Sequence, residues 1–89
     1  MKVDDEFDMA FAAAKLRARY LPAMKRAGVS GLLSVMRNAP ELRVQAAACL
    51  DENWGTVREV CPAEAPRIRA EIALIAGPYL LARLAARGA

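Results

Sequence analysis

The side chains that most often carry chemistry in proteins are few in this chain. It has no histidine, so the usual base at neutral pH and the commonest metal ligand is absent. Cys49 lies in the segment QAAACL, on the same predicted helical side as Leu42 and Ala46, which is typical of a small buried hydrophobe. Cys61 precedes Pro62 near a predicted break. The two thiols are twelve residues apart without a C-x-x-C motif, so we expect no metal site and no cofactor.

Carboxylate and phosphate chemistry are also poorly supported. Asp51 and Glu52 are adjacent, and adjacent residues on a helix point in different directions, so they do not predict an acid–base pair. Neither G-x-x-x-x-G-K-[ST] nor G-x-G-x-x-G occurs. We therefore expect no catalytic residue and no enzyme activity.

The composition predicts an all-α protein, with residues 1–89 forming a single helical domain. Alanine occupies 20 of 89 positions and is the best helix former, whereas β-branched and aromatic residues are sparse. The acidic start, MKVDDEFDMAF, differs from a secretory signal. We expect a cytoplasmic protein with reduced thiols, a disulfide between them being the alternative.

Caps and breakers predict a compact bundle of about five helices. Ser30 is a good N-cap, Pro22 and Pro40 can open helices, and Gly28 and Gly55 can end them. The expected helices cover residues 4–21, 22–28, 31–38, 40–54, a short one near 56–59, and one from about 63–66 to 87.

The last of these helices has more apolar surface than one buried face requires. One side carries Ile68, Ile72, Ile75, Tyr79, Ala82 and Ala86; the opposite side carries Ala70, Ala73, Leu74, Gly77, Leu81 and Leu84. A helix that is apolar nearly all round is buried on more than one side. Only eleven uncharged residues separate Glu71 from Arg83, too few to span a membrane. We also expect a kink or a break at Gly77-Pro78.

These observations predict a non-catalytic module that docks on another protein chain, either a second copy or a larger complex. Adaptor, inhibitor and assembly subunit are the roles considered. Trp54 either closes the core at a helix end or anchors an interface. The expected interface residues are Leu74, Gly77, Leu80, Leu81 and Leu84 on the last helix, Met9, Leu16 and Tyr20 on the first, and Trp54.

A basic middle segment supports the alternative of a small DNA- or RNA-binding regulator. Residues 9–43 hold seven bases and one acid, and such charges can contact phosphates. A solvated surface that suits the helix dipole is the competing interpretation. The expected nucleic-acid contacts are Lys15, Arg17, Arg19, Lys25, Arg26, Arg37 and Arg43.

Two stretches resemble known helical families. AGVS, residues 27–30, followed by LLSVMRN, is similar to the turn and recognition helix of lac-repressor-type helix-turn-helix domains. That resemblance covers about twelve residues, needs a deletion in the recognition helix, and implies Ser34, Arg37 and Asn38 as base readers. It also puts apolar residues such as Leu32 and Val35 where base readers belong.

The stretch from residue 28 to residue 54 resembles one unit of an armadillo or HEAT repeat, with a short apolar helix, a turn with a proline and a helix carrying VQAAACL. Such units function by stacking, and no second unit is found in this sequence. The resemblance therefore implies a packed helical hairpin and not membership of a solenoid family.

Overall fold

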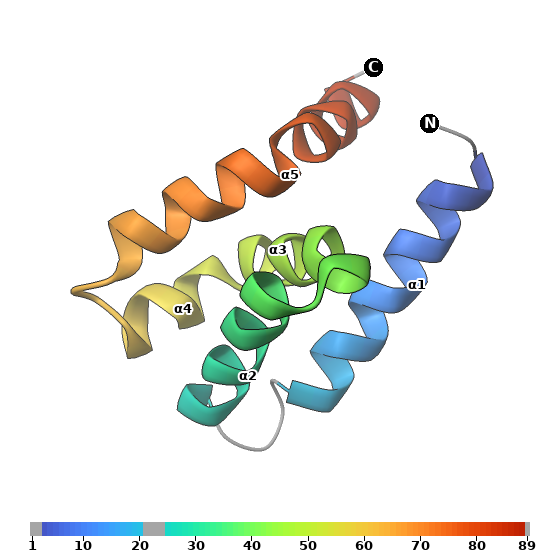
Figure 1. The fold of residues 1–89 in the computed structure, drawn as a ribbon. Coiled ribbons are helices and arrows are strands. Elements are labelled where there is room, and N and C mark those ends of the chain that lie inside the picture. Colours follow the sequence, from blue (N-terminus) through green and yellow to red (C-terminus); the bar gives the residue numbers. More distant parts are fainter. Residues whose placement is uncertain (1–2, 21–24, 89) are drawn as a thin grey trace.

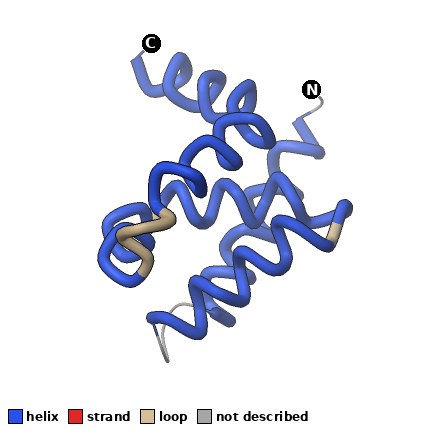
Figure 2. Tube along the Cα trace, turned by 60° about the vertical axis from the view of Figure 1, so that its left-hand side comes forward, coloured by secondary structure: helices blue, strands red, loops and turns tan. Residues whose placement is uncertain are grey.

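The computed structural model describes the backbone of residues 3–20 and 25–88 and the side chains of residues 12–20, 25–79 and 81. Over these residues the chain is helical, with short turns and no strand (Figures 1 and 2). The elements are α1 (Val3–Tyr20), α2 (Lys25–Asn38), the 3-10 turn η1 (Pro40–Leu42), α3 (Arg43–Glu52), α4 (Trp54–Val60) and α5 (Ala65–Gly88). The Cα radius of gyration is 12.6 Å, close to the about 12 Å expected for a compact chain of this length. The predicted all-α bundle of five helices is confirmed.

Helix α3 lies at the centre of the fold and packs against α1, α2 and α5 (Figure 1). Its residues 46–50 are all buried. Because successive residues point in different directions around a helix, five buried neighbours in a row mean that α3 is covered on every side. Three of the five are alanines, which let the surrounding helices approach closely. The packing of α2 against α3 agrees with the helical hairpin expected for residues 28–54.

Helix α2 corrects the prediction of two short helices over residues 22–28 and 31–38. It continues through both Gly28 and Gly31. Each glycine costs about 1 kcal/mol relative to alanine in a helix, but a buried apolar stripe that begins next to Gly28 and continues past Gly31 holds the helix together. The stripe consists of Val29, Leu32, Leu33 and Met36.

Gly31 also provides room for helix α1. A Cβ atom at this position would lie 2.7 Å from Cδ1 of Tyr20, the last residue of α1. The absence of a side chain at Gly31 therefore lets the tyrosine ring rest directly on α2.

The turn between α2 and α3 follows from Pro40. Ala39 takes the extended conformation that a residue before proline prefers, with φ −117° and ψ 91°. Beyond the turn, the Arg43 guanidinium donates a hydrogen bond of 2.9 Å to the carbonyl of Met36. Arg43 thus caps the carboxyl end of α2, where a cation suits the helix dipole.

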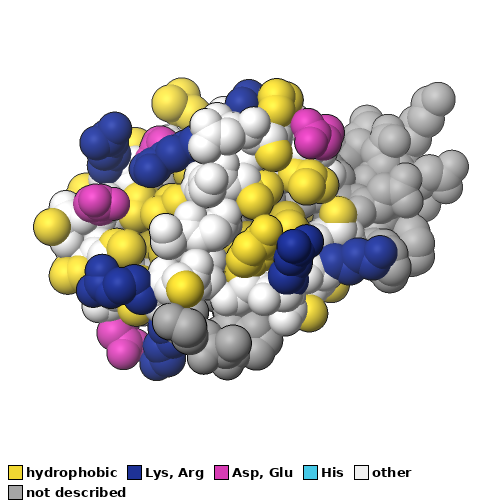
Figure 3. All heavy atoms as spheres, turned by 60° about the horizontal axis from the view of Figure 1, so that its bottom comes forward, with side chains coloured by type: hydrophobic (Ala, Val, Ile, Leu, Met, Phe, Trp, Pro, Cys, Tyr) yellow, Lys and Arg dark blue, Asp and Glu magenta, His cyan; other side chains and the backbone are white. Residues whose placement is uncertain are grey.

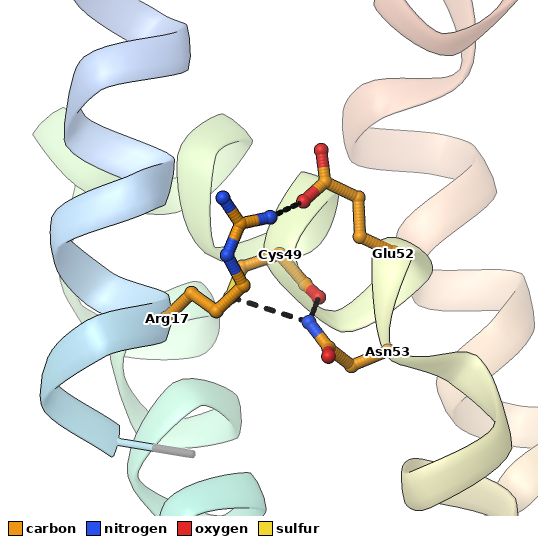
Figure 4. A network of polar contacts seen from close by, with 4 residues as sticks. All are labelled: Arg17, Cys49, Glu52 and Asn53. Carbon is orange, nitrogen blue, oxygen red and sulfur yellow. Dashed lines mark hydrogen bonds and ion pairs between the residues drawn. The ribbon is translucent and has the colours of Figure 1, made fainter. Parts of the chain in front are cut away.

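The boundary between α3 and α4 corrects a second prediction. We expected one helix over residues 40–54 that stops at Gly55, but Gly55 lies inside α4. The helix ends instead at Asn53, whose backbone leaves helical geometry at φ −114° and ψ 33°. The Asn53 side-chain amide donates to the carbonyl of Cys49 at 2.9 Å and so satisfies the end of α3 (Figure 4).

Helix α5 runs unbroken through Pro78. The expected break at Gly77-Pro78 is therefore wrong, and the alternative of a kink is not confirmed. Proline removes the hydrogen bond that the carbonyl of Leu74 would accept. Both Leu74 and Pro78 lie on the exposed side of the helix, where water can take the place of the missing donor.

Candidate functional site

One side of α5 faces away from the rest of the chain. It carries Ala70, Ala73, Leu74 and Leu81, all exposed, together with the half-buried Gly77, and we call these five residues the outer face. Leu74 is 85% exposed and Leu81 is 68% exposed. Among the described side chains, these leucines are the large apolar ones left in solvent.

The opposite side of α5 is buried in the core. Ala65, Ile68, Ile72 and Ala76 lie at three- and four-residue spacing and are at most 6% exposed. This side packs against α3. The sequence therefore identified both apolar sides of the last helix correctly, but this chain encloses only one of them.

Ion pairs join α5 to α2 and to α3 beside its buried side. The Arg37 guanidinium of α2 donates two hydrogen bonds to the Glu71 carboxylate, of 2.9 and 2.7 Å. These bonds lower the pKa of Glu71 and raise the pKa of Arg37. Near the start of α5, Arg69 pairs with Asp51 of α3. Arg67 is exposed as well and has no ion-pair partner among the described residues. It lies three residues before Ala70, the first residue of the outer face.

Trp54, half-buried, packs against the core cluster. The carbon at the centre of the Arg69 guanidinium lies 5.0 Å from the centroid of its ring, within range of a cation–π interaction. Since Arg69 also pairs with Asp51, the indole belongs to a network that joins α3, α4 and α5.

The expected contacts on α1 whose side chains are described, Leu16 and Tyr20, both lie toward the core. Leu16 is buried in the core, and Tyr20 packs against it. Ala14, by contrast, is half-buried and Ala18 is exposed. The expected interface residues Met9, Leu80 and Leu84 lie outside the described side chains.

The basic residues proposed for nucleic acid mostly contact this chain. Arg17 pairs with Glu52 of α3 (Figure 4), Lys25 lies 3.5 Å from Glu59 of α4, and Arg37 and Arg43 make the contacts described above. On the face drawn in Figure 3, the cations lie singly or in pairs and are interspersed with acidic and apolar side chains, so they form no continuous basic surface there. Arg26 and Arg37 are about 16 Å apart along α2, given 1.5 Å per residue.

A polar groove lies between α2 and the turn that joins α4 to α5. Its volume is about 490 Å³, and it is lined by Arg26, Ser30, Leu33, Ser34, Arg37, Asn38, Cys61 and Glu64. The helix-turn-helix resemblance singled out Ser34, Arg37 and Asn38, and these do face solvent. They line a hollow, however, whereas a recognition helix must protrude to enter the major groove. No pattern in the sequence pointed to Glu64, because the groove forms only when the turn after α4 packs beside α2.

The two thiols lie in different surroundings and are not bonded to each other. Cys49 is fully buried in α3, and burial raises the pKa of its thiol to about 11. Because the thiolate is the reactive form, Cys49 acts as a core residue. Cys61, half-buried, lines the polar groove.

Neither a metal site nor a membrane span emerges from the described residues. No group of three or more cysteine, aspartate or glutamate side chains there could hold a metal ion. No helix in the same part of the chain combines the length and the apolar character needed to cross a membrane. Comparisons with protein-family models, with curated proteins and with solved structures found no match to this chain.

Proposed function

We propose that this protein is a small non-catalytic module that docks on another protein chain through the outer face of α5. The proposal depends on one observation: Leu74 and Leu81 both stand in solvent on the same side of a helix whose other side already supplies the core. Their positions, seven residues apart, place them two turns apart on the same side of the helix.

Burial of these two leucines would release substantial free energy. Each leucine side chain gains about 1.5–3 kcal/mol when it is fully removed from water, and a contiguous apolar patch is the usual mark of an interaction site. Gly77 lies between them, and a Cβ atom added there would meet nothing within 4 Å. A partner's backbone can therefore approach this point of the helix closely.

The alternative of a nucleic-acid regulator draws less support. Four of its seven expected contacts, Arg17, Lys25, Arg37 and Arg43, contact carboxylates or carbonyls of this chain. Transfer to phosphates would break those contacts. The basic side chains therefore fit better with joining the helices of this fold.

Site-specific photo-crosslinking in the native host tests the docking proposal. A benzophenone side chain replaces Leu74 in one variant, Leu81 in a second, and the exposed Ala27 of α2 in a control. We expect one dominant crosslinked species of the same mass from positions 74 and 81, and none from position 27. Equal or absent crosslinking at all three positions would overturn the proposal.

A further inference from the structure

The polar groove beside α2 is large enough to hold a ligand. Its volume of about 490 Å³ lies within the range of about 300–1,000 Å³ that ligand sites in proteins occupy. Six of its eight lining side chains are polar or charged, and the other two are Leu33 and Cys61. Because an apolar ligand would take the water from these polar groups without replacing its hydrogen bonds, the lining favours a polar ligand.

Two charges in the lining have no ion-pair partner among the described residues. They are Arg26 of α2 and Glu64 of the turn after α4, both exposed. Arg37, the remaining charge of the lining, is already engaged by Glu71. The pKa of Arg37 is raised mainly by its hydrogen bonds to Glu71 and to a smaller extent by the charge of Glu64. The groove therefore offers a cation on one wall and a carboxylate on the other, and a ligand that carries both charges complements them.

The neutral polar side chains of the lining follow one another along α2. Ser30, Ser34 and Asn38 come after Arg26 at intervals of four residues, so they lie along one side of the helix. From Arg26 to Asn38 this side is about 18 Å long at 1.5 Å per residue, a length that about five residues of extended chain span. Hydroxyl and amide groups both donate and accept hydrogen bonds, as the N–H and C=O groups of a peptide backbone require.

We propose that the groove beside α2 binds a short, extended peptide segment that carries one carboxylate and one cationic side chain. The carboxylate lies at Arg26, the cation lies at Glu64, and the peptide backbone runs along Ser30 and Ser34. This site goes beyond the docking proposal and does not depend on it, because the groove and the outer face of α5 share no residue. A small anion bound at Arg26 alone is the competing occupant.

Cys61 provides a natural reporter for this site because it lines the groove. Cys49 is fully buried, and burial raises the pKa of its thiol to about 11. Iodoacetamide at neutral pH is therefore expected to alkylate Cys61 alone, and mass spectrometry of the digested chain verifies that assignment. The rate of alkylation with a peptide, relative to the rate without it, measures occupancy of the groove.

The probes are five-residue peptides with blocked ends and the same interior of serine and glycine. Two carry aspartate at one end and lysine at the other, in either order; one carries aspartate at both ends, and one carries lysine at both ends. We expect a mixed peptide to slow alkylation about fivefold or more at a concentration at which the like-charged peptides slow it less than about twofold. Equal protection by all four peptides, no protection at the solubility limit of the peptides, or equal protection by inorganic phosphate would overturn the proposal.

Charge reversal tests whether Arg26 and Glu64 set this preference. Arg26→Glu places carboxylates on both walls and is expected to transfer the preference to the peptide with two lysines. Glu64→Lys is expected to transfer it to the peptide with two aspartates. Arg58→Glu makes the same change in charge as Arg26→Glu at an exposed residue outside the lining and should leave the preference unchanged. Circular dichroism establishes that each variant is folded, and a preference that does not follow the reversals would contradict the assignment of the two charges.

Two further variants locate the bound peptide. Ser34→Trp fills the groove from α2 and is expected to abolish protection by every peptide, whereas Leu74→Ala changes only the outer face of α5 and should leave protection intact. Protection that survives Ser34→Trp, or that disappears in Leu74→Ala, would place the peptide outside the groove and overturn the proposal. Neither result bears on the docking proposal, which the crosslinks from positions 74 and 81 test by themselves.

Discussion

Helices α3 and α5 are both apolar on more than one side, yet only α3 is enclosed. All of residues 46–50 in α3 are buried, whereas in α5 the buried Ile68 and Ile72 share a helix with the exposed Leu74 and Leu81. The difference lies in the elements that cover each helix. Helix α3 packs against α1, α2 and α5, whereas the main packing of α5 is on α3 alone.

This comparison explains why excess apolar surface on a helix has two meanings. In α3 it accompanies burial on every side, whereas in α5 it leaves Leu74 and Leu81 in solvent, where we propose that a partner docks. The side chains differ as well. Helix α3 buries three alanines in a row, which suit close packing within a bundle. The outer face of α5 instead presents two leucines, whose burial by a partner would release more free energy than burial of an alanine.

The largest expected effect comes from truncating a leucine in each helix. Leu50 is fully buried in α3, so Leu50→Ala is expected to lower the free energy of unfolding by about 2–5 kcal/mol. Leu74→Ala makes the same chemical change in solvent and is expected to alter it by about 0.5 kcal/mol or less. Urea denaturation of the dilute chain measures both, since dilution removes any contribution from association. A similar loss at the two positions would break the comparison, because it would mean that this chain itself covers the outer face.

Much of the fold follows from apolar periodicity. The spacing of Ile68, Ile72 and Ile75 against Ala70, Leu74 and Leu81 is enough to predict both sides of α5. The helix boundaries expected at glycine were wrong, because burial of Val29 and Met36 outweighs the local preference of Gly28 and Gly31. The centrality of α3 was missed as well, since it depends on how many helices surround a segment, and this property belongs to the topology.

In the candidate site, too, apolar spacing predicts one part, and the other part depends on the packed fold. Exposure of Leu74 and Leu81 on one side of a helix follows from spacing, and the sequence placed both in the expected interface. The ion pairs of Arg17, Lys25 and Arg37 join residues at least 34 positions apart. Such pairs require the packed fold, so charge patterning along the chain cannot reveal them. For that reason the basic middle segment suggested a polyanion site, whereas three of its cations bridge the helices of this bundle.

An intermediate effect is expected at the proline of α5. Pro78→Ala restores a backbone hydrogen bond in a helix that is already continuous, so we expect the free energy of unfolding to rise by about 1–3 kcal/mol. Pro66 provides the matched control because it is also exposed but lies in the first turn of α5, where its missing N–H has no helical partner. Pro66→Ala is therefore expected to change stability little. Thermal unfolding followed by circular dichroism measures both variants, and a loss of stability in Pro78→Ala would mean that the packing of α5 requires the proline.

The smallest expected effect concerns the ion pair between Arg37 of α2 and Glu71 of α5, which lies away from the outer face. The pKa of Glu71 is lowered from its ordinary value of 4.5 because Arg37 donates two hydrogen bonds to the carboxylate. A carboxylate with a lowered pKa stabilises the folded state above its unfolded pKa, and this contribution is lost as the pH falls through the folded value.

Both side chains are partly solvated, at 38% and 27% exposure, so Glu71→Gln is expected to cost about 1 kcal/mol or less at pH 7. As the pH falls below 4.5 and then through the lower folded pKa of Glu71, the difference between variant and natural chain should shrink toward zero. Glu41→Gln, at an exposed residue without an ion pair among the described residues, should track the natural chain across the same range. A Glu71→Gln difference that stays constant as the pH is lowered until the carboxyl group is protonated would assign the effect to packing and not to charge, and the buried isoleucines would then account for the position of α5.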